Sequence, residues 1–186
     1  TDKDYSLTEK TIINGKEQVV LKGIDKYINY CPDHVKQLNS KYQSHENIRI
    51  AYQTGLGRTF EDEMFLSNLH GCMIQCKLLR IALSESLHSF LDGNCLSLDN
   101  WDRNRSSIDG RSQEKIHRLI DLTLNAQNNY PTEKDSYAQL FFANLFLSYA
   151  KDKKGDVALQ ILIDESLMNL LRVPDYIKDG LEWLLR

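Results

Sequence analysis

Hydrophobic residues recur at helical spacing along residues 60–91 of this chain. The apolar positions lie three or four residues apart throughout, at Phe65, Leu69, Cys72, Cys76, Leu79, Leu83, Leu87 and Phe90. This spacing places them on one side of a helix, whereas a strand would scatter them over both faces. Thr59 precedes the stretch as an N-cap residue, Asp62 follows three positions later, and Asp92-Gly93 ends it. The pattern therefore predicts one long helix over residues 60–91.

The other periodic segments are helical as well. They predict helices over residues 23–30, 32–42, 45–53, 112–127, 132–151 and 157–171, and a short last helix that carries Leu181, Trp183 and Leu184. Short connections between helices are typical of antiparallel neighbours. We therefore expect an all-α fold, a multi-helix antiparallel bundle around the long central helix. We expect a single domain over residues 1–186 whose first ten residues, 1–10, are loosely held.

The helix predicted over residues 132–151 is apolar over most of its circumference. Tyr137 and Phe141 share one face, and Phe142, Phe146 and Tyr149 share the neighbouring one. Such a helix lies either at the centre of a bundle or under a partner that covers part of it. We favour the central position.

Residues 11–21 fit two alternatives. Asn14-Gly15 stands between two β-branched runs, which is the usual sequence of a two-residue β-hairpin turn. A loop that leads into a helix starting near Val19 fits the same residues. The fold class therefore includes a small N-terminal β-hairpin as an alternative to that loop.

Charge and hydropathy limit the classes of partner. The net charge of −3 gives no bulk attraction to nucleic acid or to an anionic membrane. No apolar stretch approaches the 18 to 20 residues that cross a bilayer, and no signal-peptide pattern opens the sequence. We expect another protein as the partner, with no membrane and no nucleic acid, and self-association stays open.

Four cysteines, Cys31, Cys72, Cys76 and Cys95, are too few for a disulfide scaffold in a chain of this size. A zinc site from His70, Cys72 and Cys76 fails because His70 and Cys72 would point to different faces of one helix. We therefore expect buried thiols, no metal and no cofactor, and a cytoplasmic or otherwise intracellular, reducing location.

Residues 92–110 are the most irregular part of the chain. They are rich in Asn, Asp, Ser and Gly, with one tryptophan at the centre, and predict a long surface loop. Tryptophan and arginine are over-represented at binding hot spots. We therefore expect Trp101, Arg103 and Arg105 to contact the partner.

One spacing suggests catalysis instead. Arg111-x5-His117 resembles the Arg-x(4–6)-His motif of the HEPN family, small helical bundles of which many are metal-independent ribonucleases. The resemblance implies that His117 acts as general base or acid on a ribose 2′-hydroxyl and that Arg111 stabilises charge on the phosphate. The alternative is that Arg111 ends a loop and His117 lies on a solvated helix face. Our leading interpretation is a non-catalytic interaction or regulatory module, with this ribonuclease as the second hypothesis.

Overall fold

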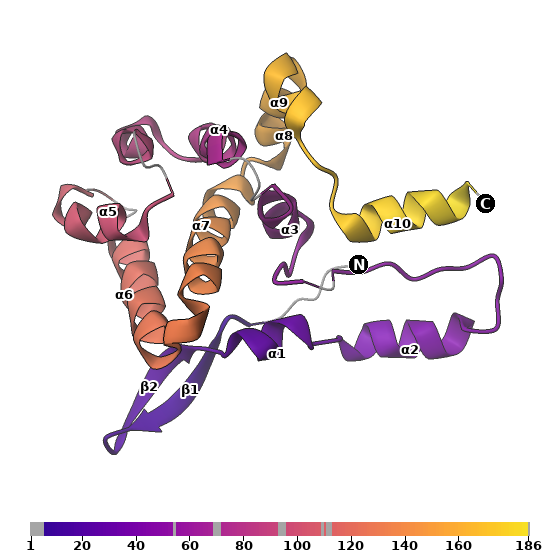
Figure 1. The fold of residues 1–186 in the computed structure, drawn as a ribbon, viewed down its shortest axis with the longest axis horizontal. Coiled ribbons are helices and arrows are strands. Elements are labelled where there is room, and N and C mark those ends of the chain that lie inside the picture. Colours follow the sequence, from indigo (N-terminus) through magenta and orange to yellow (C-terminus); the bar gives the residue numbers. More distant parts are fainter. Residues whose placement is uncertain are drawn as a thin grey trace.

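The computed structural model describes residues 6–53, 55–68, 72–92, 96–108, 110 and 113–185. This part of the chain is mostly helical, with a two-stranded antiparallel hairpin near its N-terminal end (Figure 1). The helical character predicted from the sequence is therefore confirmed, and of the two alternatives for residues 11–21 the structure shows the hairpin. None of the described helices combines the length and the hydrophobicity that crossing a membrane requires.

The hairpin consists of β1 (Thr8–Ile13) and β2 (Lys16–Leu21). The α-helices are α1 (Ile24–Ile28), α2 (Asp33–Tyr42), α3 (Phe60–Leu66), α4 (Cys72–Ala82), α5 (Leu98–Arg103), α6 (Gln113–Asn129), α7 (Lys134–Ala150), α8 (Lys154–Ile163), α9 (Glu165–Leu170) and α10 (Asp175–Leu184). Short 3-10 helices are η1 (Glu85–Leu91), η2 (Arg105–Ser107) and η4 (Pro131–Glu133).

The hairpin turn is formed by the two residues that the sequence indicates. Asn14 and Gly15 have φ values of 51° and 74°, as a type I′ turn requires, and Ile13 pairs with Lys16. Leu21, at the end of β2, belongs to a small buried cluster to which α6 and α7 contribute. Because an isolated two-stranded hairpin is marginally stable, we attribute its persistence to this packing.

The single long helix predicted over residues 60–91 is not confirmed. The stretch contains α3, α4 and η1, and residues 69–71 lie outside the described residues. Ser84, between α4 and η1, is extended, with φ −69° and ψ 151°, so no helix passes through it. After α3, the buried amide side chain of Asn68 donates to Met64 O (2.7 Å) and to Arg172 O (3.1 Å). Asn68 and Ser84 therefore mark the two places where the helix suggested by the apolar pattern is interrupted.

The apolar pattern persists across the interruptions because each segment keeps its own spacing of three or four residues. Phe65 in α3, Leu79 in α4 and Leu87 in η1 are all buried in one core. The N-terminal capping box is confirmed, since Asp62 N donates to the Thr59 hydroxyl and Thr59 N donates to the Asp62 carboxylate. The start of the stretch was therefore predicted correctly and its continuity was not.

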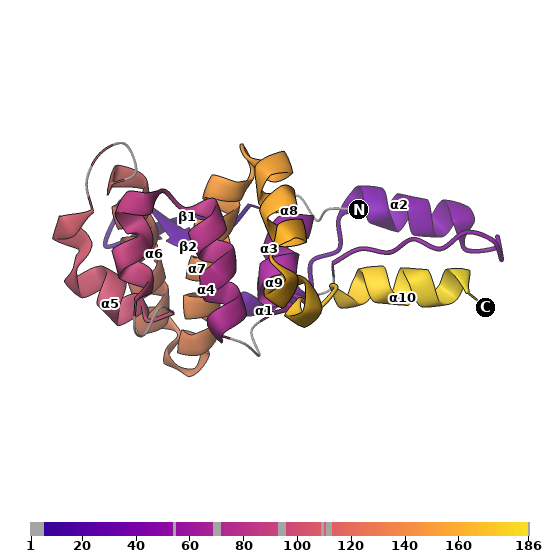
Figure 2. The ribbon, with the colours of Figure 1, turned by 90° about the horizontal axis from the view of Figure 1, so that it is seen from above.

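The central position is taken by α7. It packs against α3, α4 and α6, as both ribbon views show (Figures 1 and 2). Its two aromatic faces are both buried, with Tyr137 and Phe146 completely inaccessible. The central position predicted from the aromatic side chains of residues 132–151 therefore agrees with the structure.

The prediction of a long surface loop over residues 92–110 is wrong, because the described part of this stretch contains the helices α5 and η2. Ser97 caps α5 by accepting a hydrogen bond from Asn100 N (3.3 Å). Residues 93–95 and 109 lie outside the described residues. The polar composition suggests a loop because α5 is short and buries only two of its side chains, Leu98 and Trp101.

Two helices extend away from those around α7. In both views α2 and α10 lie beyond the helices that surround α7, with the chain of residues 43–53 running back between them (Figures 1 and 2). Val35 anchors α2 and is fully buried, whereas α10 has no buried residue. The arrangement leaves α10 incompletely covered.

The expectation of buried thiols is not confirmed. Cys72 is exposed, Cys31 is partly exposed, and Cys76 is disulfide-bonded; Cys95 lies outside the described residues. The thiols were part of our reason for expecting a reducing compartment, so an intracellular location stays a prediction.

Candidate binding surfaces

The structure does not join Trp101, Arg103 and Arg105 into one exposed patch. The Trp101 ring is fully buried, in contact with Phe90 of η1. The Arg105 guanidinium lies 2.6 Å from the Asp121 carboxylate and so connects η2 to α6. Arg103 is exposed, but its Nε donates to Asp99 O on its own helix (3.2 Å). The buried position of Trp101 does not support the prediction that its indole contacts a partner.

His117 lies on α6, and Arg111 lies outside the described residues. The His117 Nε2 atom is 2.7 Å from Arg105 O. Because a carbonyl oxygen only accepts hydrogen bonds, Nε2 must carry the proton, and in the neutral ring Nδ1 is then the acceptor. The arrangement fixes the orientation of the ring and leaves an imidazole nitrogen for other contacts.

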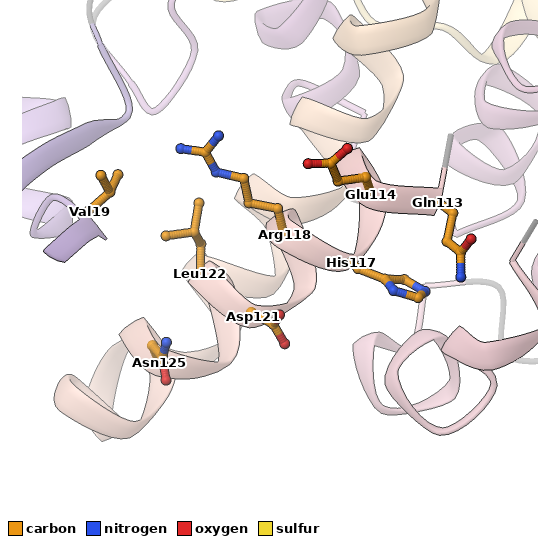
Figure 3. A pocket seen from close by; sticks show the side chains of 8 residues that line it. All are labelled: Val19, Gln113, Glu114, His117, Arg118, Asp121, Leu122 and Asn125. Atoms are coloured by element: carbon orange, nitrogen blue, oxygen red, sulfur yellow. The ribbon is translucent and has the colours of Figure 1, made fainter. Parts of the chain in front are cut away.

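A cavity of about 590 Å³, the β2–α6 groove, lies beside His117 (Figure 3). Its lining consists of Val19 from β2 and, from α6, Gln113, Glu114, His117, Arg118, Asp121, Leu122 and Asn125. In Figure 3, Arg118 and Leu122 point toward Val19, and the ring of His117 points to the other side of the helix. His117 and Arg118 therefore do not converge on one point.

Exposed apolar side chains are concentrated in another region, near the C-terminus. Residues 159–185 hold more than half of the large apolar side chains that are exposed in the described residues: Leu159, Leu162, Ile163, Met168, Leu170, Val173, Leu181, Leu184 and Leu185. We call this set the C-terminal apolar residues. Where exposed apolar side chains form a contiguous patch, they mark an interaction site.

A second cavity, the α10 groove, has a volume of about 620 Å³ and lies along α10. It is lined by Ser67, Arg172, Val173, Asp175, Lys178, Leu181, Glu182 and Leu185. Leu181 and Leu185 are 54% and 87% exposed, so the apolar part of the groove is open to solvent. The residues that lead into it are held firmly, because Arg172 N donates to Asn68 Oδ1 (2.7 Å) and Arg172 O accepts from the same side chain.

Two polar clusters elsewhere have structural roles. Asp62 accepts from Arg58 N (2.8 Å) and lies 3.3 Å from Arg58 Nε, and Arg58 Nη2 donates to Asn144 Oδ1 (2.7 Å) on α7. Burial raises the pKa of Asp62, and this outweighs the opposing effects of the Arg58 charge and of the N–H donors. The cluster thus joins the start of α3 to α7.

The second cluster contains a serine and a lysine, a pair that can perform nucleophilic catalysis. Lys77 Nζ hydrogen-bonds Ser166 Oγ and lies 2.9 Å from Asp164 Oδ2. Hydrogen bonds from Ser166, Lys77 and Leu167 N hold the pKa of Asp164 well below its usual range. Since Lys77 donates to both partners, it has no lone pair to accept the serine proton. The cluster joins α4 to the start of α9.

Neither a metal site among the described residues nor a similarity to known proteins indicates the function. Within the described residues, no group of three or more His, Cys, Asp or Glu side chains could hold a metal ion. No protein-family model matches the sequence, and no curated protein or solved structure matches it significantly. The function must therefore be argued from the surfaces.

Sequence reasoning missed the α10 groove, although a signal was present. Asp175, Lys178, Asp179 and Glu182 occupy one side of α10, and apolar residues occupy the rest. An amphipathic helix at the end of a chain is usually interpreted as core packing. Only the structure shows how little of its apolar side is covered.

Proposed function

We propose that this chain is a non-catalytic module that binds another protein through its C-terminal helices. The observation that carries the proposal is the exposure of the C-terminal apolar residues, above all on α10. Burying an exposed leucine contributes about 1.5–3 kcal/mol, so a partner that covers several of them gains substantial affinity. The site differs from the one expected at Trp101, Arg103 and Arg105.

The test is an affinity capture from a lysate of the source cell with the native chain and with the double variant Leu181→Asp/Leu185→Asp. Both side chains are exposed, so the variant keeps the fold while it places charge in the interface. We expect one protein at near-stoichiometric amount with the native chain and its loss with the variant.

The matched control is Ile12→Asp, which places the same charge at a 77% exposed residue of the hairpin. It should retain the partner. Equal recovery with the native chain and the double variant would contradict the proposal.

A second candidate, the ribonuclease of the HEPN resemblance, is supported by the imidazole of His117, whose orientation is fixed by the contact of Nε2 with Arg105 O. It predicts that the native chain cleaves single-stranded RNA in the presence of a metal chelator and that His117→Ala abolishes the cleavage. The control is His88→Ala, because His88 Nε2 also lies near a backbone carbonyl, 3.0 Å from Arg80 O. Cleavage that survives in the His117 variant would exclude this site.

A further inference from the structure

The tripeptide Asn104-Arg105-Ser106 has the acceptor pattern of N-linked glycosylation, and the sequence contains no second Asn-x-Ser/Thr. Three residues match such a pattern often by chance, so the place of the tripeptide in the fold decides whether it can serve. It lies where α5 ends and η2 begins. Asn104 and Ser106 are both exposed. The folded chain therefore presents the acceptor to solvent in a surface turn.

The amide of Asn104 has room for a sugar. Its Nδ2 atom donates to Asn100 O (2.9 Å) and to Asn100 Oδ1 (2.8 Å), which uses both amide hydrogens. A glycosidic bond replaces one of these hydrogens, so the other hydrogen bond persists and holds the modified side chain beside α5.

A cavity of about 320 Å³ adjoins this side chain and is polar except for one phenylalanine. Its lining consists of Ser89, Phe90, Asp92, Asn100, Asn104 and Ser107. The hydroxyl, carboxylate and amide groups of this lining offer hydrogen-bond partners to the hydroxyl groups of a first sugar. The surroundings of Asn104 therefore suit a carbohydrate.

The redox state of Cys76 indicates where the chain matures. Cys76 is disulfide-bonded, and disulfides form and persist in oxidising compartments such as the lumen of the endoplasmic reticulum. N-linked glycans are transferred in the same lumen. The disulfide and the exposed acceptor are independent features of the chain, and both point away from the reducing location expected from the sequence.

We propose that Asn104 carries an N-linked glycan, added while the chain passes through an oxidising secretory compartment. The donor is a lipid-linked oligosaccharide pyrophosphate. The Asn104 Nδ2 atom forms a bond to C1 of the first sugar, and the bond from C1 to the phosphate oxygen breaks. The amide gives up one proton, and the lipid pyrophosphate leaves.

The glycan leaves the proposed binding surface uncovered. In both ribbon views α5 and α10 lie at opposite ends of the molecule (Figures 1 and 2). A sugar chain at Asn104 and a partner at the C-terminal helices are therefore compatible. The inference goes beyond the proposed function and does not rest on it.

The test uses the full chain, secreted from a eukaryotic cell line behind a cleavable signal peptide. Peptide N-glycosidase F removes N-linked glycans and converts the modified asparagine to aspartate. We expect higher gel mobility after this treatment and an aspartate at position 104 in the peptide mass spectrum. A secreted chain whose mobility does not change would overturn the inference.

Four variants test the assignment to this asparagine. Asn104→Gln and Ser106→Ala each remove the acceptor pattern and should abolish the mobility change. Ser106→Thr keeps the pattern and should keep the glycan, which separates loss of the pattern from loss of the fold. The matched control Ser107→Ala changes the next exposed serine and should leave glycosylation unchanged. A mobility change that persists in Ser106→Ala would overturn the assignment.

The chain isolated from its source tests the compartment. We expect the same glycan on it, and we expect Cys76 in the denatured chain to react with iodoacetamide only after reduction. An unmodified Asn104, or a Cys76 that is alkylated without a reductant, would overturn the inference. Neither outcome bears on the proposed function, which the double variant Leu181→Asp/Leu185→Asp tests separately.

Discussion

Trp101 lies where η1, α5 and α7 meet, and three phenylalanine rings surround it. Its ring centroid is 4.8 Å from that of Phe90, 5.9 Å from Phe141 and 6.4 Å from Phe142. Aromatic groups in such contact stabilise a core beyond their buried area. Composition cannot show this position, because the residues around Trp101 in the sequence are polar while its neighbours in space come from distant segments.

We predict that Trp101→Ala lowers the free energy of unfolding by about 3–5 kcal/mol, because it leaves a large cavity in the core. Urea denaturation followed by circular dichroism measures the loss. Arg103→Ala, two residues away and exposed, should change stability by no more than about 0.5 kcal/mol. A Trp101 variant as stable as the native chain would show that the indole is not buried.

The Asp164 carboxylate makes stability depend on pH. Its pKa in the folded chain lies below the unfolded value of about 3.9, so the carboxylate stabilises the fold above that pH and loses this effect as the pH falls through the folded pKa. Asp164→Asn keeps a side-chain oxygen for the Leu167 N–H but removes the charge. We predict that the native chain is more stable than this variant near neutral pH.

The difference should shrink as the pH falls below about 4. Urea denaturation of both proteins at several pH values measures it. A difference that stays constant over the whole range would contradict the assigned hydrogen bonds and ion pair of Asp164.

At the scale of elements, the sequence predicts best where a local signal decides the structure. The Asn14-Gly15 turn, the Thr59 cap and the aromatic helix α7 are such cases. Residues 60–91 are interrupted twice, and the first interruption lies beside a distant contact, the hydrogen bond from Asn68 to Arg172 O, which the local pattern cannot show. The apolar spacing indicates only which side chains are buried, and it does so correctly for Phe65, Leu79, Leu83, Leu87 and Phe90 but not for the exposed Cys72.

The turn before α3 requires glycine at position 57. A Cβ built there would lie 2.7 Å from the Cβ and 2.8 Å from the Cα of Glu63, and backbone atoms of a helix cannot move aside. We predict that Gly57→Ala lowers the free energy of unfolding by about 1–3 kcal/mol, measured by thermal denaturation. Gly180→Ala is the control.

At Gly180 the added Cβ makes ordinary contact, 3.8 Å from Ala51, inside a helix. Alanine is favoured over glycine there by about 0.5–1 kcal/mol, so this variant should be as stable as the native chain or more stable. Equal effects of the two substitutions would contradict the described path of residues 55–63.

At the scale of the whole molecule, the chain has a well-filled core around α7 and a C-terminal part that is poorly covered. The sequence alone suggested a protein-binding module but placed the site at Trp101, because exposure cannot be derived from composition. The α10 groove forms where Ser67, just after α3, lies beside residues 172–185, and this is a long-range contact. The expected class of function therefore stays a proposal, and the structure changes where we look for its site.

Amide hydrogen exchange of the chain alone and in complex with its captured partner tests most directly whether the C-terminal helices form the binding surface. We predict that the partner slows exchange in α10 and in α8 and α9, and leaves exchange in β1, β2 and α6 unchanged. Protection confined to the β2–α6 groove, or none in α10, would contradict the claim that the C-terminal helices form the binding surface.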